Sequence, residues 1–170
     1  MHRLHLLRHA KSNPDETIED RDRRLSRRGR EAARRVGESL PKALGTVDLV
    51  LCSPSLRTRE TADLVLAQFA PMPRIVFDDA LYLAARSALM QRLSRLDESD
   101  GAVLVIGHNP GLHALALELA APDSPRYPAL ASGKFPTAAR ASFRIAGRWA
   151  ELDRSRHKLT DYVTAKSLGD

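Results

Sequence analysis

Short apolar runs alternate along the chain with segments in which apolar residues recur at the spacing of one helix face. The runs are Arg3 to Leu7, Asp48 to Cys52, Arg74 to Phe77 and Ala102 to Ile106. Each run is short and is bounded by polar or turn-forming residues, which is typical of strands buried on both faces. Strands that alternate with helices in this way predict an α/β domain with a largely parallel sheet.

The segments between these runs predict the helices. Apolar stripes at helical spacing follow the first three strands, and they are Ala33, Val36, Gly37 and Leu40, then Ala62, Val65, Leu66 and Phe69, then Leu89, Leu93 and Leu96. A stripe after the fourth strand comprises Leu112, Leu115, Ala116 and Leu119. Because proline cannot continue a helix, Pro122, Pro125 and Pro128 predict its end and a loop to about Ala139.

The last part of the chain predicts an antiparallel edge. Ala141 to Ile145 and Trp149 to Leu152 are separated by a short turn and have the pattern of a hairpin. The tail from Arg154 onward is polar and has no clear period, so we predict no element there. The expected fold is a three-layer α/β/α domain with a mostly parallel central sheet and an antiparallel edge.

Composition narrows the class of protein. With 170 residues, 43% hydrophobic and 28% charged, we expect one domain over residues 1–170, large enough to build a core without disulfides. The one cysteine, Cys52, lies in an apolar run and offers neither a disulfide framework nor a thiolate metal cluster. Since no apolar stretch approaches the length of a membrane span, we expect a soluble, cytoplasmic protein without a membrane partner.

The net charge of +6 leaves three partners open, which are nucleic acid, an acidic protein surface and an anionic small molecule. Arginines crowd between Arg21 and Arg35, but acidic residues are interspersed with them. A solvated, mixed-charge face is therefore favoured over a docking surface. Aromatic residues make up only 5% and no helix-turn-helix is recognisable, so we expect no nucleic-acid partner, and we favour a monomer.

Cations and histidines follow three of the predicted strands. Strand one runs into Arg8 and His9, strand two into Ser53 and then Arg57, and strand four into His108 and Asn109. Ligands of open parallel sheets bind beyond the carboxyl ends of the strands, so we expect these side chains to converge.

The residues that follow strands two and four also predict helix starts at the same place. Ser53 before Pro54 and Asn109 before Pro110 are each a capping residue followed by a proline at the first helical position. Free N–H groups of two helix N-termini, added to two arginines and two histidines, favour a compact anion such as phosphate.

A metal site is the competing interpretation of the histidines. His5 and His9 fall on one face of a strand, and His108 could join them. The fixed charges of Arg8 and Arg57 disfavour a metal ion, because no carboxylate is placed to offset them. We expect neither a metal nor a cofactor.

The same residues carry a family resemblance that spans nearly the whole chain. Leu6 to Ala10 resembles an Arg-His-Gly signature, Ser53 to Arg57 with Thr61 and Ala62 resembles a Ser-Pro-x-x-Arg-x-x-x-Thr-Ala segment, Gly107-His108 resembles a second histidine motif, and Thr137 is a weaker match. These motifs are those of the histidine phosphatase superfamily, which includes cofactor-dependent phosphoglycerate mutases. The short length, without room for a large cap insertion, and the segment Arg24 to Gly29 are similar to the SixA branch of phosphohistidine phosphatases.

The resemblance implies a metal-independent phosphatase in which His9 forms a covalent phosphohistidine. Arg8, Arg57 and His108, the last as an imidazolium, are expected to act on the phosphoryl group, with Asn109 and Ser53 as further binding residues. Ala10 replaces the usual glycine, which implies that the backbone there does not need a positive φ.

A second departure concerns the leaving group. Leu83 stands where related ester-cleaving members carry a glutamate general acid. Phosphohistidine can leave as a neutral imidazole and needs less help, so a phosphohistidine protein is the favoured substrate. Other carboxylates that could supply a proton are Asp15, Glu16, Asp20, Asp78 and Asp79. Two alternatives stay open: a phosphatase of small phosphoesters or pyrophosphates, and a non-catalytic module that binds phosphate or nucleic acid.

Overall fold

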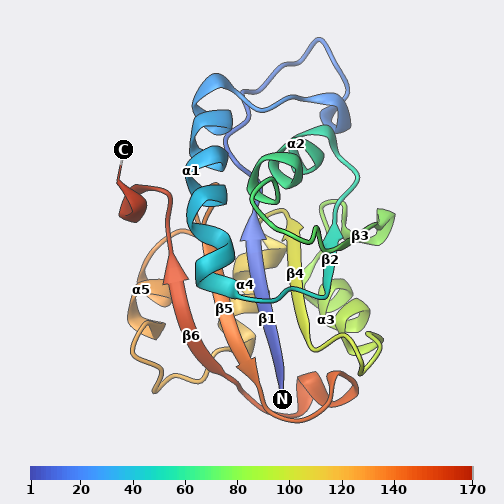
Figure 1. Ribbon diagram of the computed structural model, residues 1–170, viewed down its shortest axis with the longest axis vertical. Coiled ribbons are helices and arrows are strands. Elements are labelled where there is room, and N and C mark those ends of the chain that lie inside the picture. The colour runs from blue at the N-terminus through green and yellow to red at the C-terminus, as the bar shows by residue number, and fades with distance from the viewer. Residues whose placement is uncertain (170) are drawn as a thin grey trace.

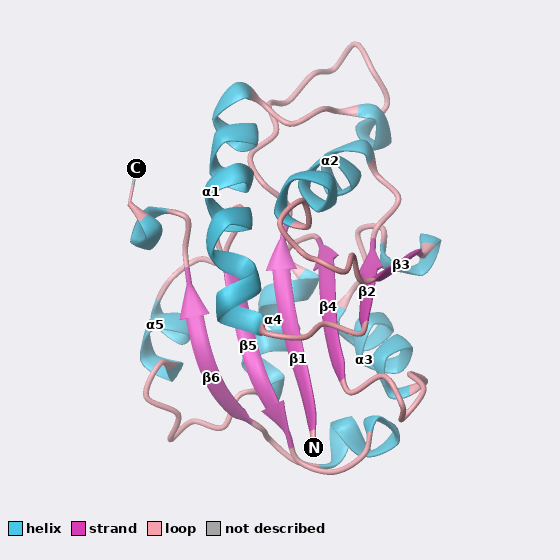
Figure 2. Ribbon diagram, viewed as in Figure 1, coloured by secondary structure: helices cyan, strands magenta, loops and turns pink. Residues whose placement is uncertain are grey.

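The computed structural model describes residues 1–169 and shows a six-stranded sheet with helices on both faces (Figures 1 and 2). The strands are β1 (His2–Arg8), β2 (Leu49–Cys52), β3 (Arg74–Phe77), β4 (Ala102–Gly107), β5 (Arg140–Ile145) and β6 (Lys158–Val163). The helices are α1 (Arg27–Leu44), α2 (Leu56–Val65), α3 (Arg86–Ser94), α4 (Gly111–Leu119) and α5 (Tyr127–Ser132).

The sheet has the order β3-β2-β4-β1-β5-β6, and its first four strands are mutually parallel. β5 pairs antiparallel with both β1 and β6. The register of β1 with β4 runs from Arg3 beside Ala102 to Arg8 beside Gly107, so the two strands end level with each other. The predicted mostly parallel sheet with an antiparallel edge is confirmed.

Two apolar layers enclose the central strands. Leu4 and Leu6 of β1 pack in the cluster that contains the apolar residues of α3 and α4, whereas Leu7 packs in the cluster that contains those of α1 and α2. Alternate strand residues therefore face opposite helix layers, as the pleat requires. β4 is buried at all six positions because it lies between β1 and β2.

The predicted hairpin is wrong in its second half. Trp149–Arg154 forms a 3₁₀ helix, in which the Trp149 indole N–H donates to the Asp100 carbonyl at 2.9 Å. The antiparallel edge strand is β6, in the polar tail for which no element was predicted. Only Leu159 and Tyr162 of β6 are buried. An edge strand that exposes most of its side chains to solvent has few apolar residues, so the sequence pattern did not predict it.

Two further predictions need correction. β3 was expected to be buried on both faces, but it is an edge strand, and Arg74, Val76 and Phe77 are exposed. The loop predicted after α4 contains the short helix α5, which has Pro128 in its first turn. Proline at that position fits a helix start, which the run of prolines concealed.

Cys52 is fully buried at the end of β2, and burial raises the pKa of its thiol to about 12. It is therefore a core residue. Among the residues that the structure describes, no helix combines the length and apolar character needed to cross a membrane.

Candidate active site

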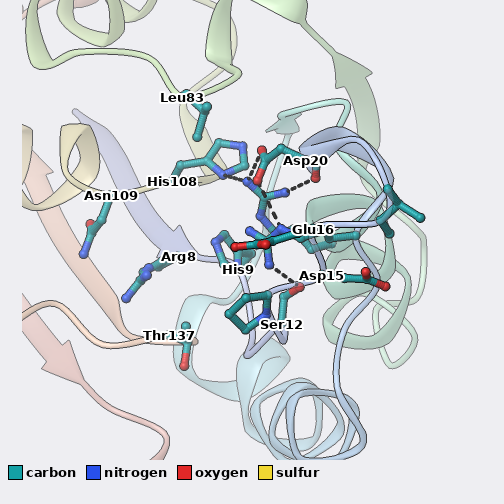
Figure 3. A pocket seen from close by; sticks show the side chains of 14 residues that line it. Arg8, His9, Ser12, Asp15, Glu16, Asp20, Leu83, His108, Asn109 and Thr137 are labelled. Atoms are coloured by element: carbon teal, nitrogen blue, oxygen red, sulfur yellow. Dashed lines mark hydrogen bonds and ion pairs between the residues drawn. The ribbon is translucent and has the colours of Figure 1, made fainter.

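A cavity of about 540 Å³ lies at the carboxyl ends of the parallel strands (Figure 3). Its lining contains Arg8, His9, Arg57, His108 and Asn109, which the sequence places on three separate segments. The predicted convergence is therefore confirmed for five of the six candidate residues. Thr137, the weaker motif match, lines the same cavity.

The His9 imidazole is buried, and one tautomer fits its surroundings. Its Nδ1 lies 2.7 Å from the carbonyl oxygen of Ala10. A carbonyl only accepts, so Nδ1 carries the proton and Nε2 keeps its lone pair. Burial, and then the charges of Arg57, Arg8 and Arg23, lower the pKa of His9 to about 4. The ring is therefore neutral near pH 7 and has a free nucleophilic nitrogen.

Thr61 ties the nucleophile segment to α2. Its Oγ1 accepts from the Ala10 backbone N–H at 3.0 Å and donates to the carbonyl of Arg57 at 2.7 Å. The Thr-Ala part of the second motif thus fixes His9 relative to Arg57. Among the described residues, the non-glycine positions with positive φ are Leu83 and Ala138, so Ala10 needs no glycine-like backbone, as predicted.

The two pocket arginines keep unsatisfied donors. Arg8 donates through Nη1 to the carbonyl of Phe135 at 3.1 Å, and Arg57 donates to the carbonyl and the carboxylate of Asp20 at 2.8 and 3.0 Å. The Nε–H groups of both arginines are buried and find no acceptor in residues 1–169. A buried donor without a partner is costly, so a bound anion would stabilise both groups.

His108 is held in a defined tautomer behind Arg57. Its Nδ1 lies 3.5 Å from Arg57 Nη2, which only donates, and its Nε2 lies 2.7 Å from Ser53 Oγ. Nε2 therefore carries the proton. Burial, with His9 and Arg57 nearby, lowers the pKa of His108 to about 3. In the ligand-free site, low solvation and the neighbouring charges therefore favour the neutral ring, whereas the imidazolium was expected with a phosphoryl group bound.

Ser53 is not a binding residue in this geometry. It is fully buried, it does not line the cavity, and its hydroxyl supports His108 instead. The two helix starts are also shifted from their predicted positions. Ser55, rather than Ser53, caps α2 by accepting from Thr58 N, and Pro110, rather than Asn109, is the cap residue of α4.

Asn109 belongs to the cavity wall through its side chain. Its Nδ2 donates to the Phe135 carbonyl at 2.7 Å, and its Oδ1 accepts from His113 N at 3.3 Å. The same Phe135 carbonyl accepts from Arg8, so one carbonyl positions two side chains of the cavity.

The loop from Ser12 to Ser26 supplies Arg23, which the sequence interpretation missed, and it places Asp20 against Arg57, where no carboxylate was expected. Arg23 lines the cavity, and its Nη1 donates to Ser12 Oγ at 2.9 Å. Asp20 bonds with Arg57, with Arg23 and with the Tyr82 hydroxyl, and the Tyr82 bond is the main cause of a lowered pKa of about 2. Asp20 is therefore ionised near pH 7, holds the Arg57 side chain in place, and is a poor proton donor. The only sequence signal was the density of Asp and Arg in this loop.

The remaining candidate acids separate into two groups. Asp78 pairs with Arg92 at 2.6 Å and Asp79 with Arg21 at 3.1 Å, and neither lines the cavity. Asp15 and Glu16 do line it. In Figure 3 the Glu16 carboxylate points into the cavity, whereas that of Asp15 points away.

Leu83 lines the cavity. It has a positive φ of 48°, and its side chain points toward His108 (Figure 3). A leucine in this backbone region is strained, and such strain persists where the surroundings fix it.

His5 does not join the other two histidines. Its Nδ1 lies 2.7 Å from Ser142 Oγ, and it lines a different cavity on the α1 side of the sheet. Within residues 1–169, no group of three or more His, Cys, Asp or Glu side chains has a metal-binding arrangement.

Comparisons with known proteins agree with this arrangement. A model of the histidine phosphatase superfamily, branch 1, matches residues 4–82. An uncharacterised protein of Mycobacterium tuberculosis is 37% identical over 150 residues, which cover 86% of this chain and 92% of the relative.

Two solved structures are similar over nearly their whole length. One, assigned as phosphohistidine phosphatase SixA of Nakamurella multipartitia, has a TM-score of 0.83 and 27% identity, covering 96% of this chain and 95% of the other. The second, with the same assignment in Agrobacterium tumefaciens, has a TM-score of 0.80 and 25% identity, covering 96% and 97%. Together with the motifs that build the cavity, these findings show that the chain belongs to branch 1 of the histidine phosphatase superfamily and has a SixA-like structure.

Proposed function

We propose that this chain is a phosphatase that removes the phosphoryl group from phosphohistidine on another protein. The observation that carries the proposal is the neutral His9, with a free Nε2 beside the unsatisfied N–H groups of Arg8 and Arg57. A lone pair next to unpaired cationic donors suits attack on a phosphoryl group. The SixA assignment of the similar structures supports the choice of substrate.

The reaction has two balanced steps. His9 Nε2 forms a bond to phosphorus while the bond from phosphorus to the substrate imidazole nitrogen breaks, and that nitrogen leaves with its electron pair. Water then attacks the phosphoryl group on His9, which releases inorganic phosphate and returns the neutral imidazole. Arg8 and Arg57 hold the phosphoryl oxygens throughout, and charge spread over those oxygens is stabilised most in the transition state.

His108 and Asn109 complete the phosphoryl site. His108 enters as a neutral ring whose Nε2–H is engaged by Ser53, so its Nδ1 faces the Arg57 side of the cavity. An incoming phosphoryl anion favours protonation of that ring, which supplies a further donor once substrate is bound. Ser53 acts through His108 as a positioning residue.

Leu83 supports phosphohistidine over alkyl phosphates. A general acid is worth typically ~100-fold to 10,000-fold for a poor leaving group, and leucine cannot supply one. A protonated phosphohistidine ring leaves as neutral imidazole and depends less on such help. Glu16, which points into the cavity, favours the second candidate, a phosphatase of small phosphoesters, because it is the carboxylate best placed to act as an acid.

A kinetic comparison tests the proposal. The full chain is assayed with a phosphohistidine protein and with a panel of sugar phosphates and nucleotides at equal concentration, in the presence of a chelator. We expect kcat/KM for the phosphohistidine protein to exceed that for every alkyl phosphate. Equal or higher values for a sugar phosphate or nucleotide would transfer the function to that small molecule, and dependence on an added divalent ion would contradict the metal-free mechanism.

A further inference from the structure

A second cavity of about 710 Å³ is lined by residues of α1 and of the segment that follows β6. Figure 1 shows these two elements as neighbours. We call this cavity the α1 groove. Its walls carry Arg28 and Arg35 from α1 and Lys166 from the C-terminal segment, and Lys11 lies at its end. Thr137 lines both this groove and the active-site cavity, so the two lie next to each other at this residue.

The charge of the α1 groove is one-sided. Among the residues that the structure describes, Lys11, Arg28 and Lys166 line it against one acid, Glu31. Glu31 already pairs with Arg27 at 3.3 Å. Small side chains such as those of Ala32 and Ala165 also line the groove, and its described lining contains no aromatic ring on which a base could stack. These features favour an acidic polypeptide over a nucleic acid, which binds through both charge and stacking.

The α1 wall is fixed relative to the nucleophile. The carbonyl of Lys11, two residues after His9, accepts from both N and Oγ of Ser26 at 2.8 and 3.1 Å. Gly29 packs so closely against this carbonyl that a Cβ would lie 2.0 Å from its oxygen. The first turn of α1 therefore rests directly on the segment that leaves the active site.

The part of the groove lined by Thr137 is also fixed relative to the nucleophile. The N–H of Ala138, next to Thr137, lies 3.1 Å from the Arg8 carbonyl and 3.0 Å from the His9 carbonyl. A polypeptide bound in the groove would thus lie at a fixed distance from the phosphoryl site. Recognition of residues that flank a phosphohistidine requires such a fixed distance.

We propose that the α1 groove docks an acidic segment of the protein substrate, next to the phosphohistidine that enters the active site. The identity of the partner rests on the proposed function, whereas binding of an acidic segment can be measured without turnover. The basic stretch of α1 is then a recognition surface, in contrast to the solvated face that its mixed composition predicted.

The test is fluorescence anisotropy of a labelled short peptide that has a central unphosphorylated histidine flanked by aspartate and glutamate. An otherwise identical peptide with asparagine and glutamine is the probe control. The test variant is Arg28→Glu with Lys166→Glu, both exposed and outside the phosphoryl site. The matched variant is Arg148→Glu with Arg154→Glu, two exposed cations near the 3₁₀ helix at the opposite end of the sheet.

We expect wild type to prefer the acidic peptide at low salt, and the groove variant to bind it about tenfold or more weakly. The matched variant should bind like wild type. Absence of the preference in wild type, or equal weakening in both variants, would overturn the docking proposal. A single-stranded oligonucleotide serves as a third probe, and loss of its binding with unchanged peptide binding would reassign the groove to nucleic acid.

Turnover separates this proposal from the proposed function. The groove variant should raise KM for an acidic phosphohistidine protein while leaving kcat/KM for an aryl phosphate unchanged. If no phosphohistidine protein is hydrolysed but the peptide binding pattern holds, the proposed function fails and the groove stands. If hydrolysis is efficient but insensitive to the groove variant, the groove proposal fails alone.

Discussion

Strand β1 and the residue that follows it place two buried histidines in similar surroundings, His5 and His9. Their exposed fractions are 5% and 7%, and each ring is close to at least two arginines. Burial and those arginines lower the pKa of His5 to about 3 and that of His9 to about 4. Burial and cationic neighbours alone therefore do not distinguish a candidate nucleophile from a structural histidine.

The arginines differ in what satisfies them. Near His5, Arg140 bonds with Asp161 and with Ser142. Arg3 donates to the carbonyl of the last residue of α1 and to another carbonyl just after it. Near His9, Arg8 and Arg57 each keep a buried Nε–H without an acceptor. Since His5 Nε2 also lacks a partner, the arginine donors rather than the ring nitrogen distinguish the two sites, and they support His9 as the candidate nucleophile.

The largest expected contrast is between removal of each histidine. His9→Ala should lower kcat by about a thousandfold or more, because the attacking atom is lost. His5→Asn should leave kcat/KM unchanged and lower the free energy of unfolding by about 1 kcal/mol, since a buried hydrogen bond to Ser142 is lost. Steady-state kinetics and urea unfolding measure both effects. Retention of more than about a thousandth of wild-type activity in His9→Ala would move the nucleophile elsewhere.

The second contrast concerns the arginines. Arg57→Lys should lower turnover by about 100-fold to 1,000-fold, because lysine cannot replace the fork of N–H donors around the phosphoryl oxygens. Arg140→Lys, near His5, where the arginine already has partners, should leave turnover unchanged. Similar kinetic losses in both variants would show that the effect is structural, and the difference between the two sites would disappear.

The third contrast is in pH dependence. The pKa values of His5 and His108 fall to about 3 and that of His9 to about 4, all below the unfolded value near 6.5. The unfolded chain therefore binds more protons below pH 6.5, and stability falls as the pH falls from there to about 4. Each histidine contributes a slope of up to about 1.4 kcal/mol per pH unit.

Urea midpoints from pH 7 to pH 4.5 measure this slope. His5→Asn should remove the contribution of one histidine to the pH dependence of the free energy of unfolding. The pH dependence of kcat/KM should stay as in wild type, because only His9 must be neutral to attack. A wild-type slope of zero over this range would contradict the lowered pKa values.

The smallest expected effect is at Leu83. Leu83→Glu should raise kcat/KM for alkyl phosphates by about tenfold and that for phosphohistidine by less, because only the alkyl leaving group lacks its own proton. The control is Leu83→Gln, in which glutamine has the shape of glutamate but no acidic proton, and it should behave like wild type. Equal wild-type rates on both substrate classes would contradict the role given to Leu83 and turn attention to Glu16.

The sequence predicted the parallel part of the fold because its strands are short apolar runs between periodic helices. It predicted five of the pocket residues because they follow strand ends and carry family motifs. β6 was missed because an edge strand that is half exposed to solvent has few apolar residues. The 3₁₀ helix at Trp149 was missed because one large apolar residue does not distinguish a helix from a strand. Ser53 and the charge state of His108 depend on which hydrogen bonds the folded chain forms, and spacing alone does not determine these.

The register of the central sheet has a consequence for biosynthesis. The His9 N–H pairs with the Gly107 carbonyl, and the Arg8 N–H pairs with the Ala139 carbonyl. The nucleophile segment is therefore held by residues synthesised about 100 and about 130 positions later. Contacts so distant along the chain require closure of a long loop before they can form. A nascent chain that has not yet released β5 from the ribosome lacks these contacts, and phosphatase activity should therefore report completed folding of the sheet.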